Sequence, residues 1–200
     1  PDEGYLLEQL PGVDPQRVER ALGVVRHGLA TALRDTLIRV YRANATGAYQ
    51  NDAASIGKRR LKNACLSYLM ALDDEASRDL AAKQYADSDN MTDSLAALAA
   101  LSDSESELFD RLLADFYGKW EEEALVIDKW FLVQATSKRQ DTLARVQGLL
   151  AHPKFSMTTP NRVRSLIGGF SMRNPFRFHE ASGAGYAFLA DQVLTLDAFN

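Results

Sequence analysis

The stretch that decides the fold is DPQRVERALGVVRHGLATALRDTLIRV, residues 14 to 40. It opens with Asp14-Pro15, which is typical of a helix start: the carboxylate can cap the first turn, and proline lacks only an N–H that would have no partner there. Apolar residues then recur at every third or fourth position, which places them on one helix face: Val18, Leu22, Val25, Leu29, Leu33, Leu37 and Val40. The stretch predicts one long amphipathic helix.

Helical periodicity continues along almost the whole chain, with no convincing strand, and predicts about nine helices. Short helices joined by short loops favour antiparallel pairs stacked in an irregular α-solenoid, an ARM/HEAT-like superhelix, with a compact bundle as the alternative. No linker divides the chain, so residues 1–200 are expected to form a single domain. After the first helix, we expect helices over residues 52–72, 74–84 and 125–134, and a last helix from Tyr186 to Leu196. Four further helices are expected from their start signals. These signals are a cap at Thr92, capping boxes at Ser104/Glu107 and Ser137/Gln140, and the pair Thr159-Pro160.

Composition excludes several classes of protein. A net charge of -4 gives no general attraction to nucleic acid or to anionic membranes. No apolar run approaches the roughly 20 residues of a membrane span, and no secretory leader is visible. A single cysteine, Cys65, rules out a disulfide within the chain and fits a reducing compartment. The chain begins at Pro1 and stops at Asn200 within an apolar pattern, so both ends are expected to be cut.

No complete catalytic motif is present. The histidines, His27, His152 and His179, lie far apart in sequence, and His179-Glu180 lacks the second histidine of a zinc-peptidase helix because residue 183 is glycine. Cys65 lies on an apolar helix face, where a buried, inert thiol is expected. The sequence contains neither a nucleophile elbow nor a phosphate-binding loop. The glycine pairs at 168–169 and 183–185 are interpreted as helix ends and tight turns.

The basic cluster of residues 58–62 has two interpretations. Lys58, Arg59, Arg60 and Lys62 could form a nuclear signal or a nucleic-acid patch. They lie within an amphipathic helix, where a solvated polar face is favoured.

Polar residues gather at one helix start. On a helix beginning near Pro160, Asn161, Arg164 and Ser165 lie three and four residues apart and share a face. Arginines near a helix N-terminus favour carboxylates. One interpretation is a structural hydrogen-bond network. The other is that Arg164, and less strongly Asn161, face an anionic or polar ligand.

Five blocks in order resemble the C-terminal helical domain of bacterial aminopeptidase N, over nearly the whole chain. They are KNAC (62–65), DNMTD (89–93), DKWFLVQAT (128–136), PNRVRSLI (160–167) and the loop from Phe178-His179 to Tyr186. No single block is decisive, but their shared order makes coincidence improbable.

The resemblance implies a parent enzyme of the gluzincin class, a cytoplasmic zinc-dependent exopeptidase that removes N-terminal residues from peptides. Its zinc motif belongs to an upstream catalytic domain, so this segment is expected to hold no catalytic, cofactor or metal site and to be inactive alone. The family's C-terminal domain is a superhelix that closes over a chamber and limits peptide access. The arginine matching Arg164 lies toward that chamber, and Asn161 is carried over more weakly.

The partners implied are therefore the catalytic domain of the same chain and peptide substrates, in a monomer, with neither nucleic acid nor membrane. The family's sequence continues beyond the position of Asn200, which predicts an exposed apolar edge on the last helix. The alternative hypothesis is a free-standing helical-repeat module that binds protein partners on a concave face.

Overall fold

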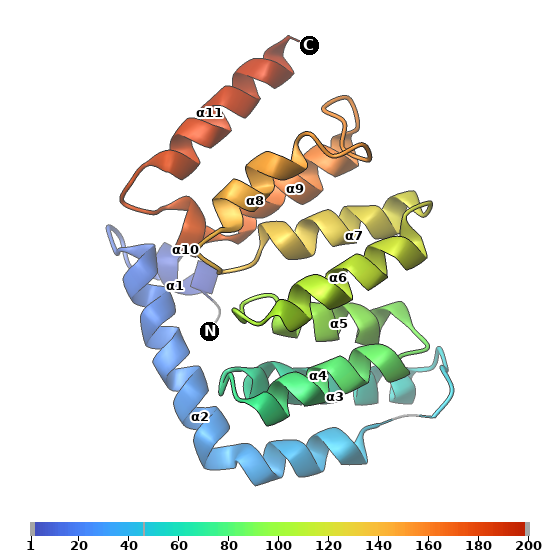
Figure 1. The fold of residues 1–200 in the computed structure, drawn as a ribbon. Helices are drawn as coiled ribbons and strands as arrows, with labels where there is room; N and C mark the ends of the chain where they lie inside the picture. Colours follow the sequence, from blue (N-terminus) through green and yellow to red (C-terminus); the bar gives the residue numbers. More distant parts are fainter. Residues whose placement is uncertain (1–2, 46, 199–200) are drawn as a thin grey trace. The chain divides into compact units, whose positions relative to one another are not determined.

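The computed structural model describes residues 3–45 and 47–198, and within these ranges all regular structure is helical (Figure 1). Pro1 and Asn200, the expected cut ends, lie outside the described residues. The helices are α1 (Glu3–Gln9), α2 (Pro15–Ala43), α3 (Ala53–Met70), α4 (Glu75–Asp87), α5 (Met91–Leu101), α6 (Glu107–Trp120), α7 (Ala124–Ala135), α8 (Thr142–Leu149), α9 (Pro160–Arg173), α10 (Pro175–Phe178) and α11 (Ala184–Asp197).

The chain divides into two compact units. The first consists of Pro1–Arg20 and Leu113–Asn200, and the second of Ala21–Leu112. Both boundaries fall inside helices, one in α2 and one in α6. No helix in the described part of the chain is both long and apolar enough to cross a bilayer.

In the second unit, α3, α4 and α5 pack on one another around a core that includes Leu66, Leu69 and Leu98. The later turns of α2 attach to this group through polar contacts. His27 Nδ1 lies 3.0 Å from the carbonyl oxygen of Ala71. Arg34 forms an ion pair of 2.7 Å with Asp74, the residue that also caps α4.

In the first unit, α9 is the central element and contacts α7, α8, α10 and α11. Its approach to α7 is close because Gly169 has no side chain: a Cβ there would lie 2.9 Å from Leu132 Cδ1 and 3.1 Å from Ala135 Cβ. The core between the helices contains Phe131 and Phe170, both fully buried. The prediction that residues 168–169 end a helix is wrong, because both glycines lie inside α9.

The predicted all-helical class and the start at Asp14-Pro15 are confirmed, since α2 begins at Pro15 and Asp14 Oδ1 accepts from the N–H of Gln16. Eleven helices replace the predicted nine in the described ranges. The two additions, α1 and α10, are short, seven and four residues, and leave little periodicity to detect.

Three predicted caps are wrong. The side chain of Asn90, rather than Thr92, caps α5 by accepting from the N–H of Asp93. Ser104 instead donates to Asp73, while Ser106 Oγ accepts from Leu108 at the start of α6. Ser137 Oγ accepts from the N–H of Arg139, ahead of α8. At α5 and α6 a neighbouring polar residue caps the helix instead, whereas the N-cap residue of α8, Asp141, makes no side-chain capping hydrogen bond.

The expected solvated face of the basic cluster on α3 is wrong for two of its residues. Arg59 and Lys62 are buried, 4% and 8% exposed. The apolar Leu61 and Tyr68 of the same helix are 49% and 41% exposed. Periodicity groups residues on a face but does not tell which face the rest of the chain covers.

Candidate functional site: the outward face of α9

The candidate site lies along one face of α9. Asn161 and Arg164 are both exposed near its start, and Ser165 and Gly168 are partly exposed one turn further on. Because successive residues are about 100° apart around a helix, these four share a face that ends at Met172, which is 83% exposed. The predicted common face of Asn161, Arg164 and Ser165 is thus confirmed.

The guanidinium of Arg164 makes no hydrogen bond or ion pair with any residue in the ranges 3–45 and 47–198. It retains five N–H donors in a planar fork that suits carboxylate and carbonyl oxygens. Asn161 adds an amide that can both donate and accept. Arg164 and Asn161 can therefore bind a polar ligand through hydrogen bonds, but neither side chain is a nucleophile.

Arg162, on the other side of α9, anchors the helix and was not singled out by sequence. It is 8% exposed and forms an ion pair with Asp128 of α7. It also donates to the carbonyl oxygens of Ala124, at 2.8 Å, and Lys154, at 2.9 Å. The sequence feature that could have indicated this anchor is Asp128, an acidic residue within the mostly apolar sequence of α7.

Asn174 fixes the end of α9. It is 2% exposed, and its Nδ2 donates to the carbonyl oxygens of Ala135, at 3.1 Å, and Ser137, at 2.7 Å. Its Oδ1 accepts from the N–H of Arg177, which caps α10. With Arg162 near the start and Asn174 after the end, α9 is held to α7 at both ends, so the outward face has a fixed position within its unit.

The described residues do not fit a zinc ion. No group of three His, Cys, Asp or Glu side chains that could hold a metal occurs in the described part of the chain. The three histidines have separate surroundings: His27 meets a backbone carbonyl, His179 bonds to the hydroxyl of Tyr186 at 2.7 Å, and His152 lies among aromatic rings.

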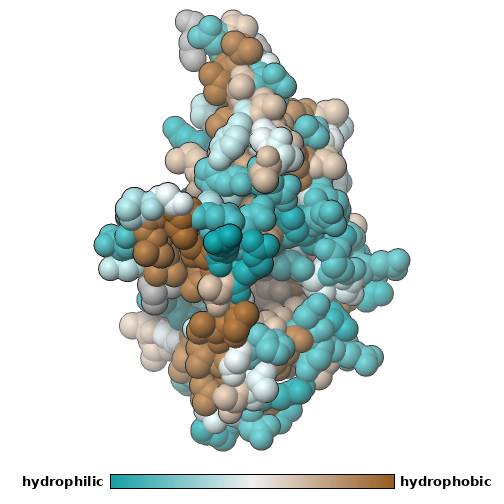
Figure 2. Space-filling model, turned by 90° about the vertical axis from the view of Figure 1, so that its left-hand side faces the viewer, coloured by the Kyte–Doolittle hydropathy of each residue, from teal (hydrophilic) through white to brown (hydrophobic). Residues whose placement is uncertain are grey.

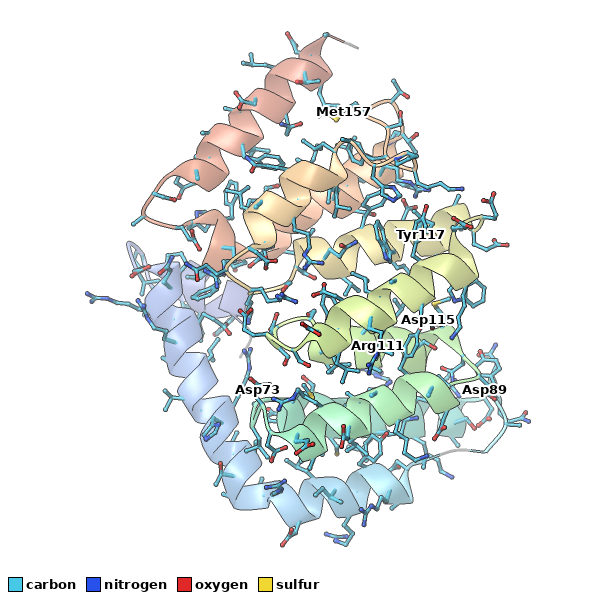
Figure 3. All side chains as sticks on the ribbon, viewed as in Figure 1. Asp73, Asp89, Arg111, Asp115, Tyr117 and Met157 are labelled. Atoms are coloured by element: carbon cyan, nitrogen blue, oxygen red, sulfur yellow. The ribbon has the colours of Figure 1, made fainter. Side chains whose placement is uncertain are left out.

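The ring of His152 packs against Tyr117 (Figure 3), Trp130 and Phe131, with centroid distances of 5.3, 5.1 and 5.7 Å. Its Nδ1 accepts a hydrogen bond from the N–H of Lys154. Burial, together with the positive charge of Lys154, lowers the pKa of His152 below its ordinary value of 6.5. A neutral, accepting imidazole suits a structural role beside α7.

Cys65 is 4% exposed, as predicted, and burial raises the pKa of its thiol. A buried thiol with a raised pKa is a poor nucleophile at neutral pH.

These features define an all-helical protein in which one face of α9 presents the exposed hydrogen-bonding side chains of Asn161 and Arg164. Over residues 1–200 the chain matches the family described as a domain of unknown function (DUF3458_C) with ARM repeats, and it belongs to that family.

The chain corresponds to the C-terminal region of bacterial aminopeptidase N. It is 38% identical over 200 residues to aminopeptidase N of Escherichia coli and 39% identical over 203 residues to that of Caulobacter vibrioides. In both cases the match covers all of this chain and 23% of the relative.

A solved structure is similar throughout. Legionella pneumophila aminopeptidase A, crystallised in complex with aspartic acid, matches with a TM-score of 0.90 and 31% identity. That match covers 100% of this chain and 24% of the Legionella chain. The chain therefore spans about a quarter of the length of the relatives that it matches.

Proposed function

We propose that this chain is the non-catalytic C-terminal domain, or a segment of it, of a cytoplasmic, monomeric zinc aminopeptidase that removes N-terminal residues from peptides. The observation that carries the proposal is the full-length match to the C-terminal region of aminopeptidase N at 38% identity. The domain packs on the catalytic domain of its own chain, encloses the active-site chamber and limits which peptides enter it.

Zinc and the bond chemistry belong to the parent's catalytic domain in this proposal. The residues described here offer no ligand set for the metal. Their contribution is to restrict access and to orient the peptide, which lowers the entropic cost of reaction without making or breaking a bond.

Two rows of exposed apolar side chains support docking on a catalytic domain. Val25, Leu29 and Leu33 follow one another at four-residue spacing along α2 and are 56%, 41% and 46% exposed. On α3, Leu61 and Tyr68 are similarly exposed. Hydrophobic patches are visible on the face shown in Figure 2, where α2 lies. Such rows are typical of surfaces covered in the complete protein.

The last helix supports the same interpretation. Tyr186, Val193 and Leu194 of α11 are 51%, 55% and 72% exposed, which confirms the predicted apolar edge. Together with Leu189 and Ala190 they line a shallow apolar depression. In the proposal, further helices of the parent cover this edge.

The outward face of α9 supplies the polar part of the proposal. Arg164, with Asn161 beside it, lines the path by which a peptide reaches the zinc. A free guanidinium on a helix fixed at both ends can bind peptide carbonyl or carboxylate oxygens without a large loss of conformational entropy.

The parent protein and residues 1–200 alone are to be assayed with an aminoacyl p-nitroanilide. We expect the parent to be active and to lose activity on chelation of zinc. The segment should remain inactive with zinc added. Chelator-sensitive activity of the segment alone would contradict the proposal.

The alternative, a free-standing interaction module, is tested by adding the segment in trans to the catalytic part of the parent. Binding that changes the selectivity between short and long peptides supports the access-controlling domain. If the segment neither binds nor changes selectivity, the access-controlling role is wrong.

A further inference from the structure

A cavity of about 600 Å³, lined by several charged side chains, lies in the second unit. The end of α2 contributes Tyr41 and Arg42, α3 contributes Lys62, α4 contributes Lys83, and α5 contributes Asp93. Asp89, in the turn between α4 and α5 (Figure 3), also belongs to its lining. This volume suits a ligand of one to three amino-acid residues.

The floor of the cavity is a buried ion pair. Lys62 Nζ lies 2.6 Å from Asp93 Oδ2, and the two side chains are 9% and 4% exposed. Asp93 also accepts from Asn63 Nδ2 at 2.9 Å and from Asn90 Nδ2 at 3.2 Å. The carboxylate of Asp93 is therefore already surrounded by N–H donors.

A second chain of hydrogen bonds holds the wall beside this pair. The hydroxyl of Tyr41 donates to Gln84 Oε1 at 3.0 Å, and Gln84 Nε2 donates to Asn63 Oδ1 at 2.8 Å. Gln84 Nε2 also donates to the carbonyl oxygen of Asp93 at 3.0 Å. Because each polar group is fixed by others, the cavity is pre-organised.

The cavity contains N–H donors of Lys62 and Arg42 that are not used within the described residues, and each of its carboxylates already accepts from at least one donor. Asp89 accepts from the N–H of Tyr49 and from Asn90, and Asp87 is paired with Lys83. Lys62 uses one of its three N–H groups on Asp93. The guanidinium of Arg42 has no hydrogen-bond or ion-pair partner among the residues described.

We propose that this cavity binds a carboxylate, with Lys62 and Arg42 as its donors and Lys83 at the rim. A carboxylate accepts several N–H donors at once and replaces the water that would otherwise solvate the nearly buried ammonium of Lys62. The carboxylate could be that of a small free acid or the C-terminus of a short peptide, and the two share this chemistry. The inference does not depend on the function proposed above.

Isothermal titration calorimetry on the full-length protein tests the inference with three probes. N-acetyl-trialanine is blocked at its N-terminus, so an aminopeptidase would not remove its first residue. The second probe is the same peptide with an amide at its C-terminus, which lacks only the negative charge. The third probe, succinate, represents a small free acid. We expect the acid peptide or succinate to bind with a Kd on the order of 1 mM, and the peptide amide to bind at least about tenfold more weakly than the acid peptide.

Two arginine variants of α2 test whether the carboxylate binds in the cavity. Arg42→Gln should weaken binding of the carboxylate about fivefold, because one charge-assisted hydrogen bond is lost. Arg39→Gln, three residues earlier on α2 and also exposed, is the matched control and should not change the Kd. Arg42 is exposed, so this variant should fold, whereas Lys62→Gln would leave Asp93 unpaired and is avoided.

If succinate binds more tightly than the acid peptide, the ligand of the cavity is a small free acid. If the acid peptide binds more tightly, the ligand is the C-terminus of a peptide. Either result supports the inference. Equal binding of acid and amide, or equal effects of Arg42→Gln and Arg39→Gln, would overturn it. These outcomes are independent of peptidase activity, so they are distinguishable from failure of the proposed function.

Discussion

The guanidinium of Arg162 on α9 and the carboxylate of Asp128 on α7 form an ion pair in which the two side chains are 9% and 14% exposed. The same guanidinium donates to two backbone carbonyls, so it serves three partners at the junction of α7 and α9. This contact, rather than a contact of the exposed Arg164, holds the candidate site in place.

Arg162→Ala should therefore destabilise the protein by about 3 kcal/mol, since it leaves Asp128 charged and largely buried without its partner. The measurement is the free energy of unfolding from urea denaturation. Arg164→Ala, two residues away and exposed, is the control and should change it by less than about 0.5 kcal/mol. Similar losses in both variants would show that the ion pair does not anchor α9.

The close approach of α11 to α10 predicts a second difference. A Cβ at Gly185 would lie 2.3 Å from the carbonyl oxygen of Phe178, so Gly185→Ala must move the backbone and should cost about 2 kcal/mol. At Gly168, inside α9, the nearest atom would be 3.8 Å away. Gly168→Ala should be neutral or stabilising by up to about 1 kcal/mol, because alanine favours helix. Thermal unfolding of both variants measures the contrast, and equal melting temperatures would refute it.

His152 predicts a pH dependence of stability. Its pKa in the folded protein is lowered below 6.5, so the unfolded chain binds the proton more readily. The contribution of His152 to stability is complete above about pH 6.5 and is lost as the pH falls below that value. His152→Asn, which keeps an acceptor for the N–H of Lys154, should give a smaller loss between pH 7.5 and 5.5. An unchanged pH profile in the variant would exclude His152 as the source.

How far the sequence predicts this structure depends on the kind of feature. The spacing of residues along the sequence correctly predicted α2 and the shared face of Asn161 and Arg164, because both follow from helix geometry alone. It could not distinguish Arg162 from Arg164 as the buried arginine, since that depends on Asp128, 34 residues away.

Burial was the other feature that spacing could not predict. Lys62 is buried because Asp93, from a different helix, neutralises it, while Leu61 beside it is exposed. The cavity of the second unit was missed for the same reason: its walls come from four helices and the turns between them, and no local motif marks it.

The central claim, that this domain controls peptide access to a distant zinc site, is tested most directly by comparing kcat/KM for a single-residue chromogenic substrate and a longer peptide in the parent enzyme. Arg164→Ala should lower kcat/KM for the longer peptide about fivefold, roughly the 1 kcal/mol of one exposed charge-assisted hydrogen bond, and leave the short substrate unchanged. Arg173→Ala is the matched control, because nine residues turn it to the opposite side of α9.

An unchanged ratio between the two substrates, through equal loss on both or no loss on either, would contradict the account. So would the same selective loss in Arg173→Ala. A selective loss on the longer peptide in Arg164→Ala alone is the result that the account predicts.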